Sequence, residues 1–124
     1  MPTGYLVPEP LDVSPKATVE ANTASATLTV ANFGKIQTNT GASAGITLTL
    51  PDPSDCAGCA IKVQVTVAQT ITLDPLTKKI YVGGSGVADK TAIIAGVIGN
   101  YANVASDGVD FLVTDYSGVV TKEA

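Results

Sequence analysis

Apolar and polar side chains alternate in short stretches along most of the chain from Ala24 onward. The clearest stretch spans residues 61–67, in which Lys62, Gln64 and Thr66 separate four apolar residues. Because successive side chains of a strand point to opposite faces of its sheet, this period of two predicts strands with one buried face. Similar stretches lie at residues 27–30, 35–38, 46–50, 71–73, 80–82, 109–114 and 119–121.

Turn-forming residues separate these stretches at intervals of roughly ten residues, as in chains built from short strands. Residues 39–42, Asn-Thr-Gly-Ala, are one example, because Asn and Gly tolerate the positive φ that tight turns need. The segment 91–98 fits a short helix or a buried strand, but Gly96, Gly99 and its β-branched residues favour a strand that residues 101–105 complete. The pattern predicts about eight or nine strands in an all-β, single antiparallel β-sandwich of the jelly-roll type.

The composition supports an all-β domain. Thr, Val and Ile account for 39 of the 124 residues, and β-branched side chains pack better on a pleated sheet than in a helix. The length fits one domain. No apolar stretch reaches the roughly 18 residues that a membrane-spanning helix needs, so no membrane partner is expected.

Residues 1–20 differ from the remainder, which we assign to the sandwich (residues 21–124). They hold four of the seven prolines, and proline lacks a backbone donor and favours extended conformations. The segment is therefore interpreted as an extended arm, which either frays or docks on a partner subunit. Its first residues show neither the basic nor the apolar segment of a secretion signal, so none is expected. The candidate contact residues of the arm are Tyr5, Leu6, Val7 and Leu11.

The charged residues argue against most binding and catalytic chemistry. The net charge is −4, and the sequence has no arginine, histidine or tryptophan. Nucleic acid is excluded as a partner because phosphate binding needs clustered cations. Without histidine the commonest general base and metal ligand is missing, so we expect no enzyme, cofactor or metal site. Only 15% of the residues are charged, against about 25% in an average protein, which indicates faces covered by neighbouring molecules.

Cys56 and Cys59 form the one motif that suggests a redox or metal site. A redox Cys-x-x-Cys works at a helix N-terminus, whereas prolines precede this motif and a predicted strand follows it. A zinc site needs four ligands, which two cysteines supply only if subunits share the ion. The remaining interpretation is structural: a local disulfide or two buried thiols.

The acidic residues and the glycine-rich segment 83–86 have plain structural interpretations. Aspartates such as Asp52, Asp55, Asp74 and Asp107 lie next to Pro, Gly or Ser, where their side chains bond the local backbone of turns. Asp107 and Asp110 flank a predicted turn and form no recognisable acid–base pair, and no aspartate-rich loop has calcium-ligand spacing. Residues 83–86 lack the Gly-Lys-Ser/Thr ending of a phosphate loop and are expected to be a loop of the sandwich.

Several segments, taken in order, resemble a family of small β-rich virion proteins of tailed bacteriophages. The resemblance covers roughly residues 24–124 and leaves the arm unmatched. The sequence departs from the family pattern in having two cysteines in one turn and Phe111 where tryptophan is frequent. The resembling segments are Asn32-Phe33-Gly34-Lys35-Ile36, residues 38–42, residues 46–51, a glycine turn at Gly58 with the valine-rich strand after it, residues 68–75, Phe111-Leu112-Val113-Thr114, a Tyr-Ser-Gly turn and residues 119–124.

The resemblance implies a structural role without enzymatic activity. Members of the family resemble capsid decoration proteins or the base domains of head and tail fibres, and they commonly form trimers. The implied partners are therefore a homotrimer of the chain itself and the major capsid protein, on the outer surface of a capsid assembled in the host cytoplasm. A head- or tail-fibre domain and a host-surface carbohydrate-binding module remain as alternatives. The few aromatic rings disfavour the carbohydrate module, since sugars stack on such rings.

Overall fold

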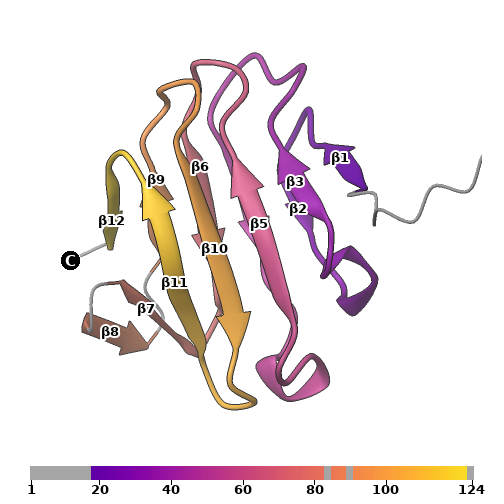
Figure 1. Cartoon of the computed structure of the whole chain (residues 1–124), viewed down its shortest axis with the longest axis vertical. Helices are drawn as coiled ribbons and strands as arrows, with labels where there is room; N and C mark the ends of the chain where they lie inside the picture. The colour runs from indigo at the N-terminus through magenta and orange to yellow at the C-terminus, as the bar shows by residue number, and fades with distance from the viewer. Residues whose placement is uncertain (1–17, 83–84, 89–90, 123–124) are drawn as a thin grey trace, which may run out of the picture.

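A computed structural model describes residues 18–82, 85–88 and 91–122, which form two β-sheets around one shared core (Figure 1). Sheet A contains, in spatial order, β1 (Val19–Ala21), β3 (Ile36–Thr38), β5 (Ala60–Gln64), β10 (Tyr101–Ser106), β11 (Phe111–Ser117), β7 (Lys79–Val82) and β8 (Ser85–Ala88). Sheet B contains β12 (Val120–Lys122), β9 (Ala92–Ile94), β6 (Ile71–Asp74), β4 (Ile46–Thr49) and β2 (Ala26–Thr27). Two short 3₁₀ helices, η1 (Val30–Asn32) and η2 (Pro53–Asp55), lie in the connections.

The prediction of a mostly-β chain with two sheets is confirmed, and the strands bury the residues that the alternation predicts. In β4, β5, β6 and β10, side chains at every second position are buried and their neighbours are half-buried or exposed. Phe111 is fully buried, with its ring centroid 6.4 Å from that of Phe33. Both sheets contribute to this one core, so each provides the apolar face that the other covers.

The strand directions correct the antiparallel prediction. Of the ten pairings among the described strands, five are parallel: β1–β3, β3–β5, β2–β4, β4–β6 and β7–β11. The cause is the path of the chain, because β1 to β6 alternate between the two sheets. Each return to a sheet therefore adds a strand that points in the same direction as the previous one. A jelly roll, whose strands pair antiparallel, is accordingly not confirmed.

The later strands pair in the expected antiparallel way. β10 lies between β5 and β11 and is antiparallel to both, and β9 is likewise antiparallel to β6 and β12. The chain thus begins with a parallel coil, β1 to β6, and its later strands pair antiparallel except for the parallel pair β7–β11. The coil ends at one edge of the molecule, where β1 and β2 are the outermost strands of the two sheets (Figure 1).

Three segments differ from the expectations of the sequence analysis. Residues 19 and 20, assigned there to the arm, belong to β1, because the Ile36 N–H donates to the Thr18 carbonyl at 2.9 Å and starts the pairing with β3. The segment 91–98 contains a strand, as predicted, but only at β9. Residues 101–105 do not complete that strand, since β10 lies in the other sheet. In segment 83–86, residues 85 and 86 belong to β8, and residues 83 and 84 lie outside the described residues.

A single buried side chain, Asn39, joins two connections of the parallel coil. Its Nδ2 donates to the carbonyls of Val67 and Gln69 at 3.1 and 3.0 Å. Its Oδ1 accepts from the backbone N–H groups of Thr66 and Val67 at 2.8 and 3.1 Å. Asn39 lies in the connection that follows β3. Its side chain hydrogen-bonds four backbone groups of the β5–β6 connection and so joins the two connections.

Candidate interaction surface

Three large apolar side chains are exposed together at one end of the sandwich. Val97 and Ile98, in the loop between β9 and β10, are 61% and 66% exposed, and Val119, in the turn between β11 and β12, is 58% exposed. The two connections lie at the same end of the molecule (Figure 1), and the Ala95 N–H donates to the Val119 carbonyl at 3.0 Å. We call Val97, Ile98 and Val119 the end patch.

Backbone hydrogen bonds hold the end patch in place. The loop folds on itself, with Val97 N–H to the Ala95 carbonyl at 2.8 Å and Asn100 N–H to the Val97 carbonyl at 3.0 Å. The Asn100 side chain also donates to the Ala95 carbonyl at 3.1 Å. On the other side, Gly118 has a φ of +81° and passes so close to Asn100 that a Cβ would overlap its side chain. The exposed side chains are therefore presented by an ordered backbone.

The end patch is suited to protein contact. Full burial of one Val or Ile side chain from full exposure contributes about 1.5–3 kcal/mol, so covering these three, each about 60% exposed, contributes a few kcal/mol to a contact. Exposed apolar side chains that gather in one place commonly mark such interfaces. The sequence analysis missed this surface, because it placed Val97 and Ile98 in a strand.

The predicted arm contacts lie outside the part of the chain that the structure describes, whereas the two cysteines lie within it. Tyr5, Leu6, Val7 and Leu11 lie outside the described residues. Both cysteines are free: Cys56 is buried and Cys59 is exposed. The pair therefore forms no disulfide in this structure, and the expectation of two buried thiols holds only for Cys56.

A fixed loop explains the burial of Cys56. The Ser106 hydroxyl at the end of β10 donates to the Pro53 carbonyl at 2.7 Å and anchors the segment after β4. The Cys56 Sγ faces the Asp52 carbonyl at 3.7 Å, and burial raises the pKa of this thiol. Cys59 follows one turn later, with its N–H donating to the Cys56 carbonyl at 2.9 Å, and its side chain lies at the surface.

The two thiols are therefore expected to react at very different rates. In the native protein at pH 8, a thiol reagent such as a disulfide dye modifies Cys59, while Cys56 reacts only after the loop opens or the chain unfolds. Titration with and without denaturant checks this, with Cys59→Ser as the matched control that leaves no fast-reacting thiol. Two equally fast thiols in the native state would contradict the placement of Cys56.

Three aspartates act as turn and cap residues, as interpreted from the sequence, whereas Asp115 lies within β11 and accepts from the Tyr101 hydroxyl at 3.2 Å. Asp52 accepts from the Ser54 N–H at 2.9 Å at the start of η2, and Asp74 accepts from the Leu76 N–H at 2.8 Å. Asp107 accepts from the N–H groups of residues 109 and 110 at 2.9 and 2.7 Å. These backbone hydrogen bonds lower the pKa of the Asp107 carboxyl, and bonds from Ser54 lower that of Asp52.

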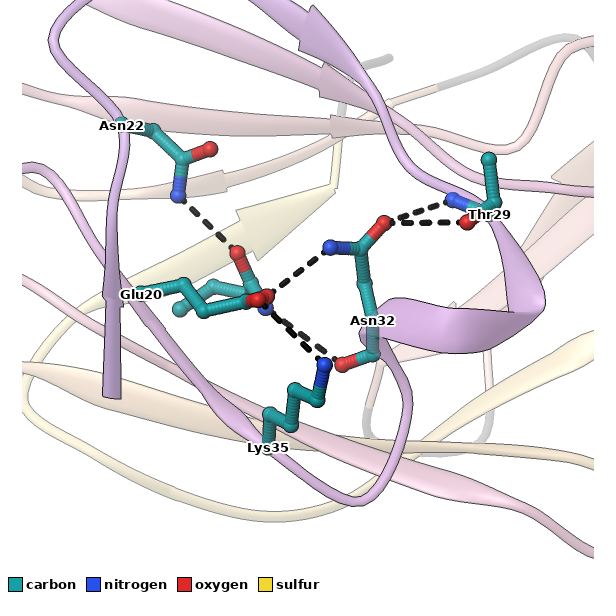
Figure 2. A network of polar contacts seen from close by, with 6 residues as sticks. Glu20, Asn22, Thr29, Asn32 and Lys35 are labelled. Carbon is teal, nitrogen blue, oxygen red and sulfur yellow. Dashed lines mark hydrogen bonds and ion pairs between the residues drawn. The ribbon is translucent and has the colours of Figure 1, made fainter. Parts of the chain in front are cut away.

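A polar cluster at the edge formed by β1 and β3 is the second site that sequence reasoning missed (Figure 2). Oε1 of Glu20 accepts from Asn32 Nδ2 at 2.8 Å and from Gln37 Nε2 at 2.7 Å, and Oε2 pairs with Lys35 Nζ at 3.4 Å. The hydrogen bonds from Gln37 and Asn32, with the Lys35 charge, lower the pKa of the Glu20 carboxyl. The cluster links β1, η1 and β3, and no local sequence spacing brings these residues together.

Comparison with protein-family models and with curated proteins finds no match to this chain. Within residues 18–82, 85–88 and 91–122, no group of three or more His, Cys, Asp and Glu side chains is arranged to hold a metal ion. Over the same residues, no helix is both long and apolar enough to cross a bilayer.

Proposed function

We propose that this protein is a structural component of a bacteriophage particle that binds the outer surface of the capsid as a homotrimer and stabilises it. The observation that carries the proposal is the end patch, three apolar side chains held on an ordered backbone at one end of the sandwich. A protein of this kind needs packing surfaces and no reactive groups. The order of segments that resembles small virion proteins and the low charge content support the same role.

The proposal gives the chain two separate contact regions. The end patch covers a partner surface, and the arm, with Tyr5, Leu6, Val7 and Leu11, reaches a neighbouring subunit or the capsid. Two modest contacts on one rigid domain bind more tightly than either alone, because the second forms within an already bound molecule. In a trimer each contact is repeated three times around the symmetry axis.

Quantitative mass spectrometry of purified particles from the source of this chain tests the role. A copy number comparable to that of the major capsid protein is expected for a decoration protein. Few copies per particle would instead assign the chain to a head or tail fibre and overturn the decoration role. Absence from the particle would overturn the virion assignment altogether. Light scattering on the purified protein tests the trimer.

The substitution Ile98→Asp is expected to weaken binding to undecorated capsids at least tenfold, because a charge replaces an apolar side chain that the partner covers. The matched control is Val109→Asp, since Val109 is also 66% exposed but lies in the β10–β11 turn at the opposite end (Figure 1). Sedimentation of capsids with each variant measures the bound fraction. Equal binding by the two variants would remove the end patch from the interface.

A further inference from the structure

A shallow groove of about 240 Å³ crosses β3, β5 and β10 on sheet A. Its floor is formed by three residues that lie opposite one another on the three adjacent strands: Ile36, Lys62 and Asn103. The neighbours of Lys62 along β5, Ile61 and Val63, are buried in the core, so these three residues face away from the core. The groove therefore lies on the outer face of sheet A.

The groove combines the apolar side chains of Ile36 and Ala60 with two polar side chains, those of Lys62 and Asn103, that make no hydrogen bond or ion pair to the described residues. Lys62 Nζ lies 4.5 Å from the centre of the Tyr101 ring and makes no ion pair with any described residue. By contrast, Lys35 at the rim is paired with Glu20. The Asn103 side chain makes no hydrogen bond within the described part of the chain, although its backbone carbonyl accepts one from Thr114. An occupant with an acidic group between apolar side chains would fit this lining.

Residues 1–17 precede the described chain and have this chemistry. The last carbonyl before β1, that of Thr18, accepts from the N–H of the groove residue Ile36 at 2.9 Å, so the segment starts at the groove. Around Asp12 it carries Leu11 and Val13, with prolines on both sides. Proline-rich extended segments dock in apolar grooves at a small entropic cost.

The distances allow the segment to reach the groove of its own subunit. Two strand spacings separate β1 from β5, which places Lys62 roughly 10 Å from the start of the segment. Asp12 lies six residues before Thr18, and an extended proline-rich chain covers about 3 Å per residue, or about 18 Å. A tether this short gives an effective concentration in the millimolar range, which favours the chain's own segment over that of a second copy.

We propose that residues 8–15 dock in this groove on their own subunit, with the Asp12 carboxylate at the Lys62 ammonium and Leu11 and Val13 over Ile36 and Ala60. The docked segment fixes the course of the arm across sheet A and leaves Tyr5, Leu6 and Val7 for a partner. The docking concerns the isolated protein and is tested without a capsid, and it alters the proposed function only in the role of Leu11. It moves Leu11 from the partner contacts to a contact within the chain.

Backbone amide order parameters of the full-length ¹⁵N-labelled protein test the docking. Values above about 0.6 are expected for residues 11–14 in the wild type, since values below this mark flexible backbone. Lys62→Glu is expected to drop them below 0.6, and the double variant Lys62→Glu, Asp12→Lys is expected to restore them. The matched control is Lys78→Glu, a charge reversal in the β6–β7 turn, which is expected to leave the values unchanged.

Three results would overturn the proposal. The first is flexible residues 11–14 in the wild type, and the second is unchanged order in Lys62→Glu. The third is order that increases with protein concentration, which would show that a second copy supplies the segment. Lys62→Met, which keeps the aliphatic stem over Tyr101, shows whether a loss of order follows from the lost charge. Unchanged amide shifts in the core strands establish that each variant is folded.

Discussion

Replacing Asn39 with alanine is expected to lower the free energy of unfolding by about 4 kcal/mol. The side chain is fully buried and hydrogen-bonds four backbone groups of the β5–β6 connection. Alanine removes all four hydrogen bonds at once and leaves three backbone groups without a partner, because the Val67 carbonyl still accepts from the Gln69 N–H at 2.6 Å. Each buried group left without a partner costs about 1–3 kcal/mol unless water reaches it. The loss is large against the roughly 5–15 kcal/mol that stabilises a typical domain.

Urea unfolding followed by circular dichroism measures the effect. The matched control is Asn103→Ala, because Asn103 is half-buried and its side chain makes no hydrogen bond to the described residues. The control is expected to change stability by less than about 0.5 kcal/mol. If Asn39→Ala also stays within 1 kcal/mol of the wild type, roughly one hydrogen bond, the amide does not hold the two connections together.

The substitution Gly118→Ala is expected to cost about 3 kcal/mol, for two independent reasons. A φ of +81° places the residue in the left-handed region, which costs a residue with a Cβ about 1–2 kcal/mol. The added Cβ also overlaps the side chain of Asn100, which must move and give up its hydrogen bond to the Ala95 carbonyl. The displaced loop carries Val97 and Ile98, so the end patch changes shape together with the loss of stability.

Gly99→Ala is the matched control for this prediction. Gly99 lies in the neighbouring loop with a φ of +99°, but nothing lies within 4 Å of the position that a Cβ would take. Only the backbone strain remains, so a loss of about 1–2 kcal/mol is expected. Thermal unfolding of both variants measures the difference. Equal destabilisation would show that Asn100 moves aside without cost.

The sequence predicts which side chains are buried better than it predicts which strands are neighbours. The alternation in residues 46–50 and 61–67 correctly places Ile46, Leu48, Ile61 and Val63 in the core. The same period of two carries no information on pairing, because it sets the face of a strand and not its partner. The connections after β3 and β4 pass from one sheet to the other, whereas the sequence analysis expected antiparallel neighbours joined by turns.

The end patch escaped prediction for a related reason. Val97 and Ile98 are apolar and β-branched, which are local properties of buried strands. At Gly96 the backbone of residues 69 and 70 lies against the chain, and a Cβ would come within 2.7 Å of the Gln69 carbonyl carbon, so glycine is required there. That approach depends on two connections far apart in the sequence, so a local pattern does not contain it.

The position of β1 determines how the molecule bears a load applied through its arm. The arm continues directly from β1, an edge strand held to β3 by three residue pairs, Val19–Ile36, Glu20–Gln37 and Ala21–Thr38. A pull along the strand strains these pairs together in shear, whereas a pull away from the sheet separates them one after another. The polar cluster around Glu20, which also includes Asn32 of η1, opposes this separation. The mechanical strength of the attachment therefore depends on the direction of the force, being greatest along β1.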